Sequence, residues 1–285
     1  MAEQRNIWLI ANEGSGSVRE ELLEKLHQSC ARFDLCIAQR TDFPRDTLPT
    51  PKDLTHEEVD TVVALGGDGT INAVVSALAG WDGAILPLPG GTQNLLTRRL
   101  HGEAEVDNVV EVFAEGKASR VRPRIIRSSQ GLALAGLLVG PGTSWNEVRE
   151  ALRAGDPAQM LRATGTAIEG TTGRPPVRLA EPPEGQREGY PIIELVPHSG
   201  GMDAAAYHAR TGSDFVAQTW ALLRQEFREG PHDSLGPFDR LVVESTGGEP
   251  LDLLLDGEPA DAGPRETFTL EKCPVDLIAT MPGGG

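Results

Sequence analysis

Cysteine is scarce in this sequence, and its spacing excludes two classes of site. The chain has three cysteines, Cys30, Cys36 and Cys273, and none belongs to a C-x-x-C pair. A structural zinc site or a dithiol redox motif needs such paired spacing, so neither is expected. The six histidines form no H-E-x-x-H pattern either. Unpaired thiols are typical of a reducing compartment, which predicts a cytoplasmic protein.

Long hydrophobic runs and basic charge are also lacking. The longest apolar stretch, residues 132–139, is far shorter than the roughly 20 residues that span a bilayer. The first residues lack the basic and then apolar pattern of a signal peptide, so none is expected. Lys and Arg number 26 against 42 Asp and Glu, a formal net charge of −16. This balance disfavours a nucleic-acid partner and bulk electrostatic attachment to an anionic membrane.

The 285 residues are enough for one large or two medium domains, at about 150 residues each. The first part of the chain alternates short apolar runs with amphipathic helices, and the rest holds many short strands. The first pattern is typical of a parallel sheet covered on both faces, and the second of a sandwich. We therefore predict a Rossmann-like α/β domain over residues 1–120 and a β-sandwich-type domain over residues 121–285.

The expected elements follow from the hydrophobic periodicity. In the first domain, strands are expected at 6–11, 33–38, 60–65 and 84–88, and helices at 18–30, 71–78, 95–100 and 106–113. In the second, strands are expected at 119–126, 132–139, 177–179, 192–196, 241–244, 251–255, 267–270 and 275–279, and helices at 145–168 and 216–227. The strands at 177–179 and 192–196 are expected to form a hairpin.

Several common nucleotide and hydrolase motifs are absent. Gly14 and Gly16 lack the third glycine of the dinucleotide fingerprint, because residue 19 is Arg19. The sequence contains neither G-x-x-x-x-G-K-[ST] nor G-x-S-x-G. An ordinary Rossmann dehydrogenase, a P-loop NTPase and an α/β-hydrolase are therefore disfavoured.

A glycine-rich turn, G-G-D-G-T at residues 66–70, follows the predicted strand 60–65. Open α/β sheets bind ligands at the carboxyl ends of their strands, where helix N-termini offer free N–H groups. The glycines permit positive φ angles and allow the backbone to approach a phosphate closely. Asp68 would repel a bare polyphosphate, so it implies a bridging Mg²⁺ or a hydrogen bond to backbone or ribose. A plain strand-to-helix turn with Asp68 as a cap is the alternative.

With other motifs of the chain, this turn resembles the diacylglycerol kinase catalytic family, which includes ceramide and sphingosine kinases. The resemblance rests on residues 12–16, Thr41 and residues 66–72, 87–94 and 255–258. Their order matches along essentially the whole chain, although residues 128–240 match only in general character. The G-D-G-T block by itself is shared with NAD kinases.

The resemblance implies transfer of the γ-phosphate of ATP to the hydroxyl of a lipid alcohol, of diacylglycerol or ceramide and sphingoid type, in a cleft between two domains. Its implied ATP-binding residues are Asn12, Glu13, Gly14, Ser15, Gly16, Thr41, Gly66, Gly67, Asp68, Gly69, Thr70, Asn72, Thr92 and Asn94. Its implied catalytic residues are Asp68, Asp256 and Glu258, one of the last two accepting the hydroxyl proton. Phosphoryl transfer fits this set, because it needs positioning, charge neutralisation and one carboxylate near the nucleophile. Outside the family, an Asp-Gly pair is a common hairpin turn.

Three departures from the family pattern keep alternatives open. Glu13 stands where proline is usual, and Leu95 stands where many members have Asp. The stretch 198–203 keeps a glycine and Asp203 of an Asp-Asp-Gly segment that binds a structural Mg²⁺, so that ion is in doubt, whereas a catalytic Mg²⁺ carried by ATP near Asp68 is retained. A catalytically degenerate lipid- or nucleotide-binding protein of the same fold is the main alternative, and an NAD kinase is a minor one.

The expected partners are a lipid alcohol and a membrane surface visited transiently, at the inner face, with no nucleic acid and with a homodimer left open. Arg120, Arg122 and Arg124 alternate along one predicted strand and are interpreted as a solvated face rather than a lipid-phosphate site. Arg98 and Arg99 end a short predicted helix, where cations favour the helix dipole.

Overall fold

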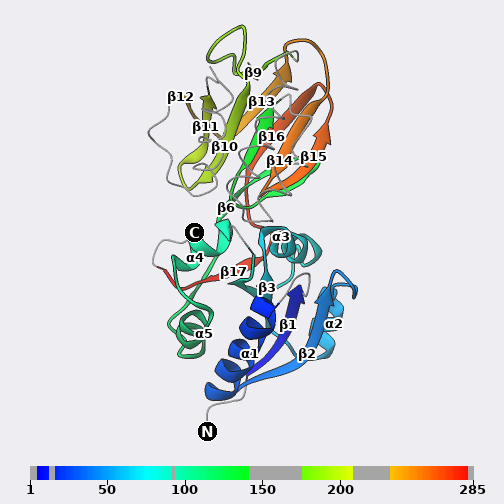
Figure 1. Cartoon of the computed structure of the whole chain (residues 1–285), viewed down its shortest axis with the longest axis vertical. Coiled ribbons are helices and arrows are strands. Elements are labelled where there is room, and N and C mark those ends of the chain that lie inside the picture. The colour runs from blue at the N-terminus through cyan, green and yellow to red at the C-terminus, as the bar shows by residue number, and fades with distance from the viewer. Residues whose placement is uncertain (1–4, 13–16, 92–93, 141–174, 208–231, 282–285) are drawn as a thin grey trace. The chain divides into compact units, whose positions relative to one another are not determined.

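The computed structural model describes residues 5–12, 17–91, 94–140, 175–207 and 232–281. The chain divides into two compact units, the first formed by residues 1–123 and 272–285 and the second by residues 124–271. Figure 1 labels most of their elements. Among the described residues, no helix has the length and apolar character needed to cross a membrane.

The first unit is built on a six-stranded sheet. Its strands, in spatial order, are β2 (Leu35–Phe43), β1 (Arg5–Asn12), β3 (Thr61–Gly66), β4 (Ala84–Pro89), β17 (Asp276–Ala279) and β5 (Ser119–Val121). All neighbours are parallel except β17 and β5. Every residue of β3 is buried, because a central parallel strand is covered on both faces.

The described residues of this unit form five helices: α1 (Ser17–Arg32), α2 (Pro51–His56), α3 (Asp68–Ala77), α4 (Leu95–His101) and α5 (Val106–Ala114). Helices α1 and α5 pack together, as Figure 1 shows, and share one core with one face of the sheet. The helices contribute Leu26 and Val109 to this core, and the strands contribute Leu9 and Val63. Helix α3 packs against β3, so its start is held at the end of a buried strand.

The second unit contains two antiparallel sheets. The six-stranded sheet has the order β12 (His232–Phe238), β11 (Gly201–Tyr207), β10 (Ile192–His198), β8 (Leu137–Gly140), β14 (Leu251–Leu255) and β15 (Glu258–Ala262). The five-stranded sheet has the order β7 (Gly131–Ala133), β6 (Arg124–Ser128), β16 (Arg265–Lys272), β13 (Arg240–Ser245) and β9 (Val177–Glu181). Residues of both sheets fill one core, among them Leu195, Leu253, Val243 and Phe268. This is a β-sandwich, as predicted.

The end of the chain differs from the sequence-based division, which placed all of residues 121–285 in the second domain. Strand β17 lies between β4 and β5, so residues 272–285 belong to the first unit. Leu277 and Ile278 are buried there. A parallel pairing between strands so distant in sequence leaves no local signal, which is why the pattern missed it.

The predicted strand 119–126 is two strands in the structure, because Pro123 has no N–H to continue a ladder. Strands β5 and β6 flank it and belong to different sheets. Arg120 and Arg124 therefore do not share one strand face, and the prediction that they do is wrong. Arg122 forms an ion pair with Asp276 at 2.6 Å.

Other predicted elements also change. The strand predicted at 132–139 is broken into β7 and β8, and β9 pairs with β13 rather than forming a hairpin with β10. Helix α2 lies where no element was predicted, and it begins with a capping box in which Thr50 and Asp53 bond reciprocally. The helices predicted at 145–168 and 216–227 lie outside the described residues.

Candidate functional site

The direction in which the chain adds strands to the parallel sheet of the first unit reverses between β1 and β3. From β1 the chain continues to β2 on one side, and from β3 to β4 on the other. Ligands of open α/β sheets bind outside the carboxyl ends of the strands at such a switch point. Asn12 ends β1 there, and its Nδ2 donates a hydrogen bond to Thr70 Oγ1 at 2.8 Å. This bond joins the end of β1 to the first turn of α3.

Two glycine turns meet at the same edge of the sheet, after β3 and after β4. A Cβ on Gly91 would lie 2.5 Å from the Cα of Gly67, and one on Gly90 would lie 2.9 Å from the nitrogen of Gly66. Gly90 N also donates to the Gly66 carbonyl at 3.0 Å. The turns therefore need glycine because two main chains touch. Gly66, Gly67 and Gly69 do not use the positive φ that glycine permits, so the close approach of the backbones is what requires glycine here.

Helix α3 starts directly after the first of these turns, and its N-cap is Gly67, which has no side chain to bond the first amides of the helix. Its first backbone bond runs from Ile71 N to the Gly67 carbonyl at 3.1 Å. The amides of the first helical turn therefore lie at the carboxyl edge of the sheet, where the helix dipole favours an anion. Together with glycines that leave no room for a Cβ, this arrangement fits a phosphate group.

The carboxylate of Asp68 caps another helix. Its two oxygens accept hydrogen bonds from Leu95 N and Leu96 N, each at 3.1 Å, and the residue is buried. These amides begin α4. Of the roles that the sequence left open for Asp68, a hydrogen bond to backbone is therefore present. Position 95, where the family often has Asp, contributes its amide to this contact.

Asn94 completes the turn that leads into α4. Its backbone is left-handed, with φ of 54°. Its side chain accepts from Gly91 N and donates to the Gly91 carbonyl, both at 2.9 Å. The amide group of Asn94 thus fixes the glycine turn after β4.

The other predicted nucleotide residues lie in different places. Thr41 lies inside β2 rather than after it, and its hydroxyl accepts from Trp8 Nε1 at 2.9 Å. Asn72 lies within α3 and accepts from Ser76 Oγ at 3.3 Å. The remaining five lie outside the described residues: Glu13, Gly14, Ser15, Gly16 and Thr92.

A buried histidine holds the far end of α4. His101 Nε2 lies 3.0 Å from the Pro87 carbonyl, and Nδ1 lies 3.0 Å from Thr280 Oγ1. A carbonyl can only accept, so Nε2 carries the proton and Nδ1 accepts from the hydroxyl. Burial lowers the pKa of His101 to about 4, which keeps the ring neutral. Sequence analysis did not select this residue, because a lone histidine carries no motif.

In the second unit, Asp256 binds three backbone amides. Its carboxylate accepts from Leu134 N at 2.7 Å, Ala135 N at 2.8 Å and Gly136 N at 3.1 Å. These amides form the turn between β7 and β8, and Asp256 itself is buried. The contact explains why the predicted strand 132–139 is broken at residues 134–136. No local sequence pattern predicts this contact.

Asp256 and Gly257 also form a two-residue hairpin turn. Their φ angles are 48° and 87°, and Leu255 pairs with Glu258 on either side. Two positive φ angles are typical of a type I′ turn. Glu258 is the first residue of β15 and is half-buried. The structure thus places one carboxylate in a structural contact and the other at the start of an edge strand.

A second titratable cluster lies on neighbouring strands of the six-stranded sheet. Tyr207 donates its hydroxyl proton to Glu194 at 2.8 Å, and its ring lies 5.8 Å from that of His232. Burial raises the pKa of Glu194 to about 7 and also raises that of Tyr207. His232 is the first residue of β12.

Within the described part of the chain, no group of three or more His, Cys, Asp and Glu residues could hold a metal ion. The stretch 198–203, considered for a structural Mg²⁺, forms the turn between β10 and β11. His198 Nε2 lies 3.5 Å from Asp203 Oδ2, and both side chains are exposed. The donor set therefore does not fit a structural Mg²⁺ site.

Some residues of the switch-point site were not selected from the sequence. Gly90 and Gly91 carry the contact with the first glycine turn; they lie within the motif at residues 87–94 but were not among the implied ATP-binding residues. Trp8 supports Thr41 from β1, and no motif marks it.

Comparison with known proteins points to one family. Residues 6–123 match the family model described as the diacylglycerol kinase catalytic domain. The "Putative lipid kinase" of Streptococcus pneumoniae serotype 4 (strain ATCC BAA-334 / TIGR4) is 30% identical over 109 residues, which are 36% of this chain and 36% of that protein. The "Diacylglycerol kinase" of Staphylococcus aureus (strain JH9) is 35% identical over 68 residues, 23% of this chain and 22% of that protein. The chain thus spans little more than a third, at most, of these curated relatives.

One solved structure is similar along nearly the whole chain. It is a diacylglycerol kinase from Bacillus anthracis str. Sterne, with a TM-score of 0.64 and 17% identity, and 98% of each chain is covered. At this identity the likeness shows the fold. It confirms the predicted parallel-sheet α/β domain with a second, antiparallel part.

Proposed function

We propose that the protein is an ATP-dependent lipid kinase, because residues 6–123 match the family model of the diacylglycerol kinase catalytic domain. It transfers the γ-phosphate of ATP to the hydroxyl of a lipid alcohol of diacylglycerol or ceramide and sphingoid type. The observation that carries the proposal is the pair of glycine turns in contact at the start of α3, beside the bond between Asn12 and Thr70.

In this proposal the first unit holds the nucleotide. The amides at the start of α3 and the turn at Gly90 and Gly91 bind phosphate oxygens, because glycine lets main chain approach closely. Asn12 and Thr70 orient the phosphates at the switch point. Asp68 acts as a positioning residue, since its two oxygens bond the start of α4.

The proton of the lipid hydroxyl goes to Glu258 in this proposal. Asp256 is the weaker candidate, because its carboxylate already accepts three amide hydrogen bonds. Glu258 directly follows that fixed turn, so Asp256 positions it. A carboxylate that accepts the proton as the hydroxyl attacks is what phosphoryl transfer requires.

We further propose that Mg²⁺ enters with the ATP phosphates near Asp68 and neutralises their charge. The lipid is met at a membrane surface visited transiently, from the cytoplasmic side, and no nucleic acid takes part. Cosedimentation with lipid vesicles tests the membrane contact, and sedimentation velocity tests for a homodimer.

The experiment is incubation of the whole chain with γ-³²P-labelled ATP, Mg²⁺ and a panel of diacylglycerol, ceramide and sphingoid bases. Label in an organic-extractable product is expected. Glu258→Gln should lower that product strongly while ATP still binds, and Glu249→Gln, an exposed glutamate of the same unit, is the matched control. Equal turnover in Glu258→Gln and the control would remove Glu258 from the reaction.

The same experiment tests the two alternatives. The first alternative is a binding protein that has lost turnover. It is supported by the carboxylates of Asp68 and Asp256, which both accept hydrogen bonds from backbone amides. ATP binding without labelled lipid would support that alternative. Label in NAD, added to a parallel reaction, would support an NAD kinase.

A further inference from the structure

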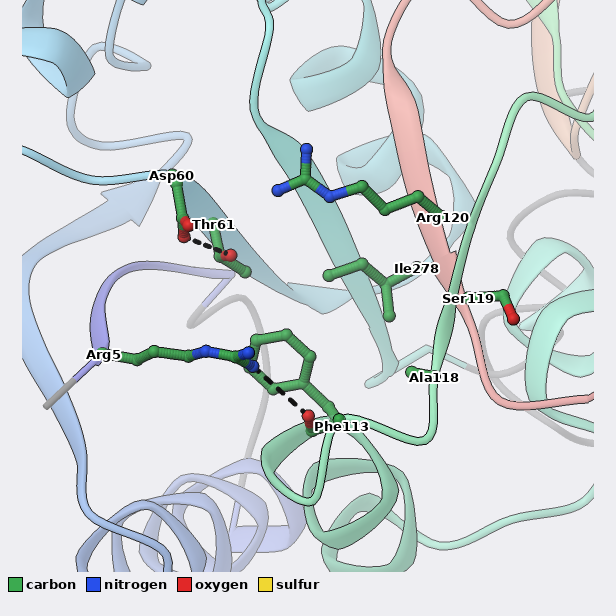
Figure 2. A pocket seen from close by; sticks show the side chains of 9 residues that line it. Arg5, Asp60, Thr61, Phe113, Ala118, Ser119, Arg120 and Ile278 are labelled. Atoms are coloured by element: carbon green, nitrogen blue, oxygen red, sulfur yellow. Dashed lines mark hydrogen bonds between the residues drawn. The ribbon is translucent and has the colours of Figure 1, made fainter. Parts of the chain in front are cut away.

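A pocket of about 170 Å³ opens in the first unit at the amino ends of the parallel strands, away from the glycine turns (Figure 2). Arg5 begins β1 and Thr61 begins β3, and both line it. Ser119 and Arg120 of β5 contribute from the far edge of the sheet, and Phe113 from the end of α5. We call this space the Arg5–Arg120 pocket. It is lined by these five residues and by Asp60, Gly116, Ala118 and Ile278.

Both arginines of this pocket are weakly neutralised. No ion pair within the described residues involves Arg5, which stacks on the Phe113 ring at 5.3 Å and donates to the Phe113 carbonyl at 3.5 Å. Arg120 lies 4.0 Å from Asp276, whose carboxylate is 2.6 Å from Arg122. These two contacts hold the Arg5 guanidinium beside Phe113, and its planar fork of N–H donors suits an oxyanion.

Two weakly neutralised arginines in one pocket are unusual in a protein with a net charge of −16. The only carboxylate among the residues lining the pocket is Asp60, which accepts from the Thr61 hydroxyl at 2.7 Å. Glu115, close in sequence, is paired with Lys117 at 2.8 Å. Two guanidinium groups against one carboxylate leave the pocket with a net positive charge, which suits a small anion.

We propose that the Arg5–Arg120 pocket binds hydrogen phosphate. Its volume holds about five or six waters and lies below the roughly 300 Å³ of sites for drug-sized ligands, so a nucleotide or lipid does not fit. Arg5 and Arg120 bind the charged oxygens, and the protonated oxygen donates to Asp60. Sulfate carries no proton at neutral pH, so one of its oxygens would face the Asp60 carboxylate with no proton between them. The site therefore disfavours sulfate. This site does not depend on the proposed kinase activity.

Binding there has a structural consequence for the first unit. The anion would bridge the first residue of β1 to β5, two strands far apart in both the sequence and the sheet. A ligand that binds only the folded state raises the midpoint of thermal unfolding. Phosphate should therefore raise the Tm of the whole chain more than chloride or sulfate at equal ionic strength.

The test is titration of the whole chain with inorganic phosphate, followed by isothermal calorimetry and by ³¹P line broadening. Arg5→Gln and Arg120→Gln should each weaken binding at least about tenfold, because a hydrogen bond to a charged group is worth that factor or more. Arg127→Gln, an exposed arginine paired with Glu271 in the second unit, is the control and should bind normally. Asp60→Asn should remove the preference for phosphate over sulfate.

Three results would overturn the proposal. They are no saturable binding at millimolar phosphate, unchanged affinity in both arginine variants, and competition by ATP, which would place the anion at the glycine turns. If Arg5→Gln does not fold, Arg120→Gln and Arg5→Lys still decide the matter. The lysine variant keeps the charge without the fork and should weaken binding.

Discussion

Lowering the pH from 7 to 4 should destabilise the first unit through His101. The imidazole is buried, donates from Nε2 to the Pro87 carbonyl and accepts at Nδ1 from Thr280. Protonation of Nδ1 would reverse its hydrogen bond with the Thr280 hydroxyl and bury a positive charge, and burial is the main cause of the lowered pKa. The unfolded chain takes up this proton near the usual pKa of 6.5, and the folded chain only near 4.

The sign and size follow from this difference. Between pH 6.5 and 4 the unfolded chain binds more protons at His101 than the folded one, so stability falls as the pH falls. The contribution is fully present above pH 6.5. The difference between 6.5 and about 4 corresponds to about 3 kcal/mol in the free energy of unfolding, as an order of magnitude.

Urea unfolding at a series of pH values measures the effect against the variant His101→Gln. Glutamine can still donate to the Pro87 carbonyl but does not titrate in this range. In a background with Trp145→Phe and Trp220→Phe, the two remaining tryptophans, Trp8 and Trp81, both report on the first unit. The wild-type protein should lose stability relative to the variant steadily from pH 6.5 to 4.

A constant difference between the two proteins across this range would refute the reasoning. It would mean that the ring is hydrated or already charged in the folded protein. A difference that grows as the pH rises would refute the sign and point to a raised pKa.

Three further predictions concern single positions. Gly91→Ala should weaken ATP binding in a fluorescence titration, and it should lower both Tm and the free energy of unfolding, the latter by about 1–3 kcal/mol, because its Cβ would lie 2.5 Å from Gly67 Cα. The control Gly200→Ala, whose Cβ would meet no atom within 4 Å, should change neither ATP binding nor Tm. Asp256→Asn should lower the urea stability of the second unit by about 1–3 kcal/mol, since three amides lose a charged acceptor; an unchanged midpoint would contradict this. Glu194→Gln should stabilise the chain by about 3 kcal/mol above pH 7 and not at all below pH 4.5, since the folded pKa is raised from 4.5 to about 7. Thermal unfolding at both pH values tests this.

The sequence was most informative where periodicity and local chemistry agree. Continuous apolar runs predicted β3 and β4, and the turns after them predicted where α3 begins. The contact between Gly67 and Gly91 could have been expected, because parallel neighbours end at one edge of a sheet. The position of the site followed from these turns.

Contacts between distant segments could not be predicted in this way. Asp68 caps α4 and Asp256 holds the turn at residues 134–136, and both contacts join a side chain to amides far along the chain. An amide donor has no sequence signature, so a carboxylate in such a contact resembles a catalytic one. The same limit applies to β17, whose partner strand lies far earlier in the chain.

The return of β17 makes the second unit an insertion within the first. During synthesis, β4 and β5 acquire the strand between them only when residues 276–279 leave the ribosome. Until then β4 presents an open edge, of the kind that recruits other chains. Proteolytic trimming of residues 276–279 would thus damage the parallel sheet of the first unit first, although that sheet is encoded almost entirely in residues 5–121.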